Sequence, residues 1–330
     1  MLEEFVNNAN NLKSLYTAGP SSLTIESLES LQPCFGRGDA TYNDIENIVL
    51  KKLLALSGQE KIVRLQGSAT LALEIALNNF CKGKILVINT GYYSNRIINI
   101  LNLIKNHDNR VFTIDQVDYK KINSIKGNYD WIIACYTETS IGFKLEIELL
   151  AFLSNKLNSK LFLDATASIG LENKHDLADV CCFSSCKGLF GLTGASFITY
   201  NSCLEINEPK NSHYLRLSTH INKGVTGPYH TILSLHGILE NYKNLRARVL
   251  KWQSVFTDYF SSHLIYPKQN QPILCTAINS NIKYLKQNPV IYTPRSNTVK
   301  SIVCHIGQVH QPVEYINTDS ISKHFQISDS

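Results

Sequence analysis

A single lysine, Lys187, lies in the segment CCFSSCKGLFGLTGASFI, between a Ser/Cys-rich run and a Gly-rich run. Apolar residues precede and follow it, so the pattern predicts a lysine directly after a buried strand. Apolar surroundings favour the neutral form of a lysine, and a neutral amine can attack a carbonyl carbon to form a Schiff base. A surface lysine in a loop is the alternative interpretation.

An aspartate, Asp164, ends another apolar segment, LFLDATASIG, 23 residues before Lys187. Burying a carboxylate costs free energy unless a cation or a strong hydrogen-bond donor meets it. Taken alone, Asp164 is more often the N-cap of a helix that follows a strand. Taken with Lys187, it could pair with a protonated nitrogen of a bound molecule.

The segment LQGSATLALEIAL offers a site for an anion, because Ser68, Ala69 and Thr70 end a strand-like run and begin a helical one. Free N–H groups at a helix start, with two hydroxyls, can bind a phosphate, although an ordinary serine-capped helix explains the segment equally well. The segment has neither the GK[ST] ending of a Walker loop nor a GxGxxG motif. A phosphate at Ser68, a ring nitrogen at Asp164 and an aldehyde at Lys187 together predict pyridoxal 5'-phosphate.

Short apolar segments alternate with helical patterns between about residues 60 and 200. This alternation predicts an α/β fold, with a mostly parallel sheet sandwiched by helices. Ligands of such sheets bind at the carboxyl ends of the strands, where Asp164 and Lys187 are expected. The expected strands are 84–89, 110–114, 130–136, 160–165, 179–184 and 195–200, and the expected helices are 68–80, 95–106 and 146–158.

The pattern changes in the last third of the chain. Residues 228–263 predict one long helix that leads out of a large domain, and residues 264–330 hold short strand-like pieces typical of a small C-terminal α+β domain. We therefore expect a large cofactor-binding domain over residues 15–240. The small domain is expected to combine residues 1–14 with residues 241–330.

Composition excludes several classes of protein. Of the 330 residues 44% are hydrophobic, and the net charge of +5 is scattered without a Lys/Arg block, so nucleic acid is not an expected partner. The acidic N-terminus lacks the pattern of a signal peptide, and no apolar run reaches membrane-spanning length. Nine scattered cysteines do not form a disulfide framework, and Cys181, Cys182 and Cys186 lack the second half of a metal site. A cytoplasmic protein without membrane or metal is predicted.

Seven motifs, in order over about residues 15–235, carry a resemblance to a known family. TAGPSSLT resembles TPGP, LQGSATLALEIAL resembles LQGSGTxxxExAL, TGYYSNR resembles NGAYGxR, and ETSIG resembles ETTSG. LDATASIG resembles MDAxSxxG, SSCKGLFGLTGASFI resembles SSNKxxxGxPGxGFV, and GVTGPYH resembles FTSPTH. The chain thus resembles the class V aminotransferases among the fold-type I pyridoxal-phosphate enzymes, most closely the 2-aminoethylphosphonate:pyruvate transaminases.

The resemblance implies a role for each residue around the cofactor ring. Lys187 would hold the cofactor as a Schiff base and later move a proton, and Asp164 would keep the ring nitrogen protonated. Tyr93 would stack on one face of the ring, although a core aromatic is the alternative, and Thr166 would contact the other face. Thr139 would donate a hydrogen bond near the ring oxygen.

The resemblance also implies phosphate and substrate contacts. Ser185 would join Ser68, Ala69 and Thr70 at the phosphate, while Cys186 stands where relatives carry Asn or Gln. Thr226 would reach the phosphate of the neighbouring subunit, so a homodimer with a shared active site is implied. Gly19, in the TAGP motif, would border the substrate.

One motif departs from the family. Relatives carry FRIGxIG in the small domain, with an arginine that binds the substrate carboxylate, whereas this chain has SIVCHIG with Ile302 at that place. Arg295 and Arg37 are candidates to replace it, and either could equally be a surface arginine.

The resemblance implies ping-pong transamination between a small aminophosphonate or related amine and a keto acid. A fold-type I decarboxylase or lyase, or a pyridoxal-phosphate-binding protein without transaminase activity, remains an alternative. A cysteine desulfurase is disfavoured, because such enzymes typically stack a histidine on the ring and this chain has Tyr93.

Overall fold

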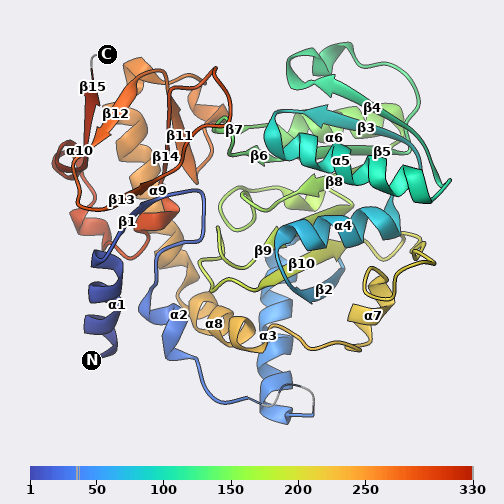
Figure 1. Ribbon diagram of the computed structural model, residues 1–330, viewed down its shortest axis with the longest axis horizontal. Coiled ribbons are helices and arrows are strands. Elements are labelled where there is room, and N and C mark those ends of the chain that lie inside the picture. The colour runs from blue at the N-terminus through green and yellow to red at the C-terminus, as the bar shows by residue number, and fades with distance from the viewer. Residues whose placement is uncertain (35, 37, 329–330) are drawn as a thin grey trace.

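The computed structural model describes residues 1–34, 36 and 38–328, and its centre is a seven-stranded sheet in the order β2-β10-β9-β8-β5-β3-β4 (Figure 1). Strand β10 runs antiparallel to both β9 and β2, and the pairs β9–β8, β8–β5, β5–β3 and β3–β4 are parallel. The mostly parallel α/β sheet is therefore confirmed. The strands are β2 (Lys61–Gln66), β3 (Gly83–Asn89), β4 (Val111–Asp118), β5 (Trp131–Cys135), β8 (Lys160–Asp164), β9 (Val180–Ser184) and β10 (Ala195–Tyr200).

Helices cover both faces of this sheet. Alternate residues of β3 enter different cores: Ile85 and Val87 pack with α4 (Ala69–Phe80) and α5 (Tyr92–His107), while Leu86 and Ile88 pack in the opposite core. That second core includes residues of α3 (Ala40–Ser57), α6 (Ile147–Leu157) and α8 (Tyr229–Glu240). Burial on both faces explains why the strands read as continuous apolar runs in the sequence.

The single long helix expected over residues 228–263 is wrong. The structure has α8 and then α9 (Tyr242–Tyr259), with a break at Asn241, whose φ of −112° and ψ of 18° are not helical. The Asn241 side-chain amide donates to Glu26 Oε1 at 2.6 Å, on a segment far away in the sequence. The apolar spacing is helical on both sides of Asn241, so the sequence pattern alone did not show this break.

The C-terminal part is built from small two-stranded sheets, as expected for an α+β unit. Strand β11 (Cys275–Ile278) pairs with β14 (Ser301–Cys304), and β12 (Asn281–Tyr284) pairs with β15 (Phe325–Ser328), which follows α10 (Thr318–His324). The N-terminal segment, with α1 (Leu2–Asn11) and α2 (Ile25–Glu29), joins it through the parallel pair β1 (Ser14–Tyr16) and β13 (Pro289–Ile291). The exact division into two domains stays a prediction.

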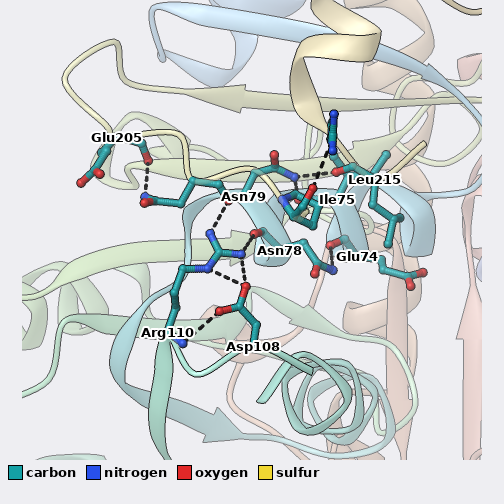
Figure 2. Close-up of polar contacts among 11 residues, drawn as sticks. Glu74, Ile75, Asn78, Asn79, Asp108, Arg110, Glu205 and Leu215 are labelled. Atoms are coloured by element: carbon teal, nitrogen blue, oxygen red, sulfur yellow. Dashed lines mark hydrogen bonds and ion pairs between the residues drawn. The ribbon is translucent and has the colours of Figure 1, made fainter. Parts of the chain in front are cut away.

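The connection between β10 and α7 (Leu217–Ile221) is held against α4 by polar contacts (Figure 2). Asn79 is fully buried; its amide donates to Leu215 O at 2.7 Å, and its own carbonyl accepts from Asn207 N at 2.7 Å. Arg110 adds a contact to the same connection by donating to Asn207 O, while its Nε donates to Asp108 Oδ2 at 2.6 Å. These bonds fix a long irregular segment over the side of the sheet opposite α3.

In the part of the chain that the structure describes, no helix is both long and apolar enough to cross a bilayer. All nine cysteines lie within the described residues, and each is a free thiol.

Candidate active site

A cavity of about 420 Å³ opens where β5, β8 and β9 end, and most of the predicted residues line it. Because the carboxyl ends of parallel strands meet at one edge of a sheet, residues distant in sequence converge here. A wider hollow of about 730 Å³ lies between α4, α5 and residues 207–215, but none of the predicted site residues lines it. The predicted residues in the smaller cavity are Ser68, Ala69, Thr70, Tyr93, Thr139, Asp164, Thr166 and Lys187.

Asp164, the last residue of β8, presents a buried carboxylate to the cavity. Its Oδ1 accepts from the Thr166 backbone N–H at 3.0 Å and also from the Thr166 hydroxyl. Within the described residues its Oδ2 accepts no hydrogen bond from protein, so one oxygen is left for a donor on a bound molecule. Asp164 is thus held in place without being fully satisfied, as a pairing partner for a protonated nitrogen must be.

The start of α4 carries uncommitted donors. Ser68 is the N-cap residue, and its side chain makes no capping hydrogen bond. The amides of Leu71 and Ala72 turn back to Ser68 O, which leaves the N–H groups of Ala69 and Thr70 without an intrahelical partner. Since the helix dipole also favours negative charge here, this corner of the cavity suits a phosphate.

Lys187 lies three residues beyond the end of β9, half-buried at the wall of the cavity. Its Nζ is 5.7 Å from the centre of the Tyr93 ring. The backbone of Gly19 packs on its aliphatic part, since a Cβ at residue 19 would lie 2.9 Å from Lys187 Cγ. Gly19 does not line the cavity itself, and it acts on the site through the position of Lys187.

Aromatic and cationic side chains gather at the first turn of α5. The Arg295 guanidinium lies 4.1 Å from the centre of the Tyr92 ring and 5.8 Å from that of Tyr93. Arg96 lies 5.0 Å from the Tyr93 ring centre, and its Nη1 donates to Thr70 Oγ1 at 3.0 Å. Arg96 lines the cavity and was missed as a site residue, although it is the last residue of the motif TGYYSNR.

Two buried threonines aim unsatisfied hydroxyls at the same region. Thr137 is the first residue of β6 (Thr137–Glu138), and Thr139 directly follows this strand. Both threonines line the cavity. Their Oγ1 atoms are buried and have no hydrogen-bond partner among the described residues. Such groups are costly unless a ligand satisfies them. The set of donors and the Asp164 acceptor therefore fit a phosphorylated pyridine with ring oxygen and ring nitrogen.

Charge and burial set the state of a neighbouring thiol. Cys135, at the end of β5, lines the cavity and is buried. Burial raises the pKa of Cys135 well above its ordinary value, and the nearby Asp164 and Glu138 carboxylates raise it further. Cys135 is therefore a neutral wall of the site, and no nucleophilic role follows from its position.

Besides Gly19, three of the predicted residues that the structure describes lie outside the cavity lining, namely Ser185, Thr226 and Arg295. The Ser185 hydroxyl donates to Leu192 O at 2.6 Å, and Ser184 and Cys186 line the cavity in its place. Thr226 is exposed on the surface, and Arg295 is exposed beside Tyr92. Arg37 lies outside the described residues.

Ile302, at the place of the family's arginine, is a fully buried residue of β14. It pairs with Ala277 of β11 and belongs to the main apolar core. The surrounding side chains are apolar, so the residue at this position does not bind a substrate carboxylate.

No family model matches the chain. It is similar to the 2-aminoethylphosphonate–pyruvate transaminase of Pseudomonas aeruginosa, with 26% identity over 251 residues that cover 69% of this chain and 68% of the relative. The 2-aminoethylphosphonate–pyruvate transaminase 2 of Paraburkholderia xenovorans shows 26% identity over 255 residues, with the same two shares covered.

Solved structures of other aminotransferases share the fold. The aspartate aminotransferase of Thermus thermophilus matches with a TM-score of 0.74 at 18% identity, covering 89% of this chain and 93% of that one. The pyridoxamine–pyruvate aminotransferase of Mesorhizobium loti matches with a TM-score of 0.75 at 19% identity, covering 91% and 88%. The chain therefore has the fold of the fold-type I aminotransferases, and its predicted resemblance to the 2-aminoethylphosphonate–pyruvate transaminases is confirmed.

Proposed function

We propose that this protein is a pyridoxal-phosphate-dependent aminotransferase that acts on a small aminophosphonate or related amine with a keto acid as partner. One observation carries the proposal: Lys187, Asp164 and the start of α4 line a single cavity. A base, a carboxylate and a phosphate-binding helix start have different chemical tasks, and pyridoxal phosphate needs all three. The named relatives are transaminases of an aminophosphonate, which supports the choice of amine.

Each residue has a defined task in this proposal. Bound pyridoxal phosphate supplies a ring that withdraws electrons from the substrate carbon. Asp164 would accept a hydrogen bond from the protonated ring nitrogen, and the N–H groups of Ala69 and Thr70 would bind the phosphate. Lys187 would hold the cofactor covalently, and its Nζ, once free, would be the base that moves a proton from the substrate carbon to the cofactor.

The remaining contacts orient the ring. Tyr93 lies near Lys187 and would contact one face of the ring, while Thr166, held by Asp164, would contact the other. Thr139 offers its unpartnered hydroxyl to the ring oxygen. Ser185 does not contribute its side chain to the cavity in this structure, so its phosphate role depends on a rearrangement of the 185–192 turn.

For the substrate anion we propose Arg295, with Arg96 as a second cation at the same end of the site. The exposed Arg295 guanidinium stacks on Tyr92 near the cavity, and among the described residues it forms no ion pair with a carboxylate, so it is open to a phosphonate or carboxylate of a substrate. The pKa of the exposed Tyr92 phenol is lowered, through Arg96 first and Arg295 next, which reflects the positive charge collected here. Arg37 remains a candidate from the sequence alone.

A homodimer with a shared active site is part of the proposal. Thr226 is exposed rather than in its own cavity, and residues on both sides of it contact the large domain. Lys223 forms an ion pair with the buried Glu46, which also accepts from Arg64 Nε at 2.6 Å. A Cβ at Gly227 would lie 2.5 Å from Arg64 Cζ, so the backbone packs directly on that guanidinium. A segment anchored at Lys223 and Gly227 that exposes Thr226 suits a contact with a second copy.

A cytoplasmic location is also proposed. The nine free thiols, eight of them buried or half-buried, are typical of a protein that remains in a reducing compartment.

A second candidate, a fold-type I decarboxylase or lyase, is favoured by one observation. Ile302 is buried in the apolar core at the place where the family's transaminases bind a substrate carboxylate. An enzyme that does not bind a keto acid as a second substrate would not need that arginine.

The test is a half-reaction screen with purified protein loaded with pyridoxal phosphate. On adding 2-aminoethylphosphonate, the visible band of the bound cofactor is expected to convert to the aminated form, and a keto acid is expected to restore it. Carbon dioxide release or elimination without keto-acid dependence would instead establish the second candidate. Intact cofactor absorbance with no response to any amine of a panel would contradict both.

A further inference from the structure

A second buried carboxylate, Glu138, lies beside the site without touching the cavity. It is fully buried at the end of β6, and no lysine or arginine forms an ion pair with it among the described residues. Five hydrogen-bonding groups converge on it instead: the backbone N–H groups of Tyr93, Ser94 and Ser140, and the hydroxyls of Thr90 and Ser140.

These contacts make Glu138 the cap of α5. The N-cap residue of α5 is Gly91, which has no side chain to bind the free N–H groups of the first turn. Instead, Glu138, which lies on strand β6, caps the helix: its Oε2 accepts from Tyr93 N at 3.1 Å and from Ser94 N at 3.2 Å. A negative charge at this end also interacts favourably with the helix dipole.

Gly91 is required for this approach. A Cβ on Gly91, whose φ is +154°, would lie 3.2 Å from Glu138 Cδ and 2.9 Å from Ser140 Oγ. The missing side chain is therefore what lets the carboxylate reach the helix end.

Ser140 extends the same junction to the C-terminal part of the chain. Its hydroxyl donates to Glu138 and accepts from Tyr92 N at 3.3 Å, and its carbonyl accepts from Arg295 N at 3.2 Å. The junction thus joins the aromatic pair of α5 to the segment that carries Arg295. Burial raises the pKa of Glu138, while the hydrogen bonds from Ser140, Ser94 and Tyr93 oppose that rise.

We propose that Glu138 is a positioning residue of this site, which caps α5 from outside and so sets where the Tyr93 ring and the Arg295 segment lie. Loss of the charged acceptor would release the first turn of α5, and Tyr93 would no longer hold a fixed place near Lys187. The catalytic consequence rests on the proposed function, but the capping itself does not.

The experiment compares Glu138→Gln with a matched control, Glu172→Gln. Glu172 is also buried, accepts from Ile273 N at 2.8 Å and pairs with Lys144, but it does not touch α5. In protein without cofactor, Glu138→Gln is expected to speed hydrogen exchange of the Tyr93 and Ser94 amides by about 10-fold or more, whereas Glu172→Gln leaves them unchanged. Unchanged exchange in Glu138→Gln, or equal acceleration in Glu172→Gln, would overturn the proposal.

Two further measurements connect capping to the site. Pyridoxal phosphate is expected to bind Glu138→Gln about 10-fold more weakly, with a shifted visible band, because the ring face has moved. The same band in Glu172→Gln is expected at its wild-type position, and an unshifted band in Glu138→Gln with wild-type affinity would overturn the positioning role. If wild-type protein binds no pyridoxal phosphate, the proposed function fails, while the exchange rates still decide the capping.

Should Glu138→Gln not fold, Ser140→Ala gives the same test. It removes one donor to Glu138 and the acceptor of Tyr92 N, and the same acceleration at α5 is expected on a smaller scale. Hydrogen exchange at the wild-type rate in a folded Ser140→Ala variant would show that the contacts of Ser140 with Glu138 and Tyr92 do not hold the start of α5.

Discussion

The backbone of Gly19 packs against the side chain of Lys187. A Cβ at residue 19 would lie 2.9 Å from Lys187 Cγ and 3.3 Å from Lys187 Cε. The next residues continue the contact, since Ser21 N donates to Cys186 O at 2.9 Å. An N-terminal segment remote in sequence thus packs directly against the lysine and the residue before it.

Gly19→Ala is therefore expected to displace Lys187 and to slow its covalent reaction with pyridoxal phosphate by about 10-fold or more, because the contact is with the middle of the side chain. Gly38→Ala is the control. Both glycines have positive φ, +138° and +85°, but no atom of the described residues lies within 4 Å of a Cβ at Gly38. Rates are measured by the growth of the visible band, and equal rates in the two variants would show that backbone strain alone is responsible.

Arg295→Gln is expected to raise KM for 2-aminoethylphosphonate by about 10-fold or more with a small change in kcat, since the cation binds the substrate anion and not the reacting atoms. Lys300→Gln removes an equal charge from an exposed residue close by in the chain and serves as the control. Steady-state kinetics check both variants. An unchanged KM in Arg295→Gln would remove Arg295 from the substrate site.

Ile302→Arg does not restore the arginine of the family but is expected to unfold the protein. The side chain is 0% exposed and faces an apolar core, where an unpaired charge costs several kcal/mol, roughly the stability of a domain. Ile302→Val is expected to cost only about 1 kcal/mol. Urea unfolding measures the stability of both variants. A stable, folded Ile302→Arg variant would mean that the space around residue 302 opens toward the active-site cavity.

Several buried histidines, among them His175, His305 and His324, make the fold sensitive to acid. Burial lowers the pKa of His175 to about 4, of His305 to about 3 and of His324 to about 4, from an ordinary value of 6.5. Between those values the unfolded chain binds more protons than the folded one, so the free energy of unfolding falls as pH decreases from about 6.5 toward 4.

Each histidine contributes at most about 1.4 kcal/mol per pH unit in that range. His175→Gln keeps a polar partner for Ser168 Oγ, which lies 2.9 Å from His175 Nε2, and is expected to reduce this slope. Urea unfolding at a series of pH values checks the change. An identical slope in wild type and His175→Gln would show that His175 is not a buried neutral group.

Much of the site could be predicted because its geometry follows from strand order. Asp164 and Lys187 each follow an apolar strand, and parallel strands bring such positions to one edge. The start of α4 was recognisable from Ser68 for the same reason. Residue type and position were enough to assign these groups, although they lie far apart in sequence.

Other features depend on contacts that no local pattern contains. At the break, Asn241 donates a hydrogen bond to Glu26, and Ile302 is buried because it packs in the main apolar core. The Ser185 hydroxyl turns to Leu192 rather than to the cavity, a choice of side-chain partner that spacing cannot indicate. The sequence shows Glu138 only as part of the motif ETSIG. Its capping role could not be predicted, because its five hydrogen-bond donors lie on both sides of it in the chain.

Lys187 is expected to form the covalent bond to the cofactor. The most direct measurement is to load the protein with pyridoxal phosphate, reduce it with borohydride, digest it and locate the label by mass spectrometry. We expect one label per chain, on the peptide that contains Lys187, and none in a folded Lys187→Ala variant treated in the same way. A label on another lysine in the wild type, or an equal label in Lys187→Ala, would show that Lys187 does not bind the cofactor.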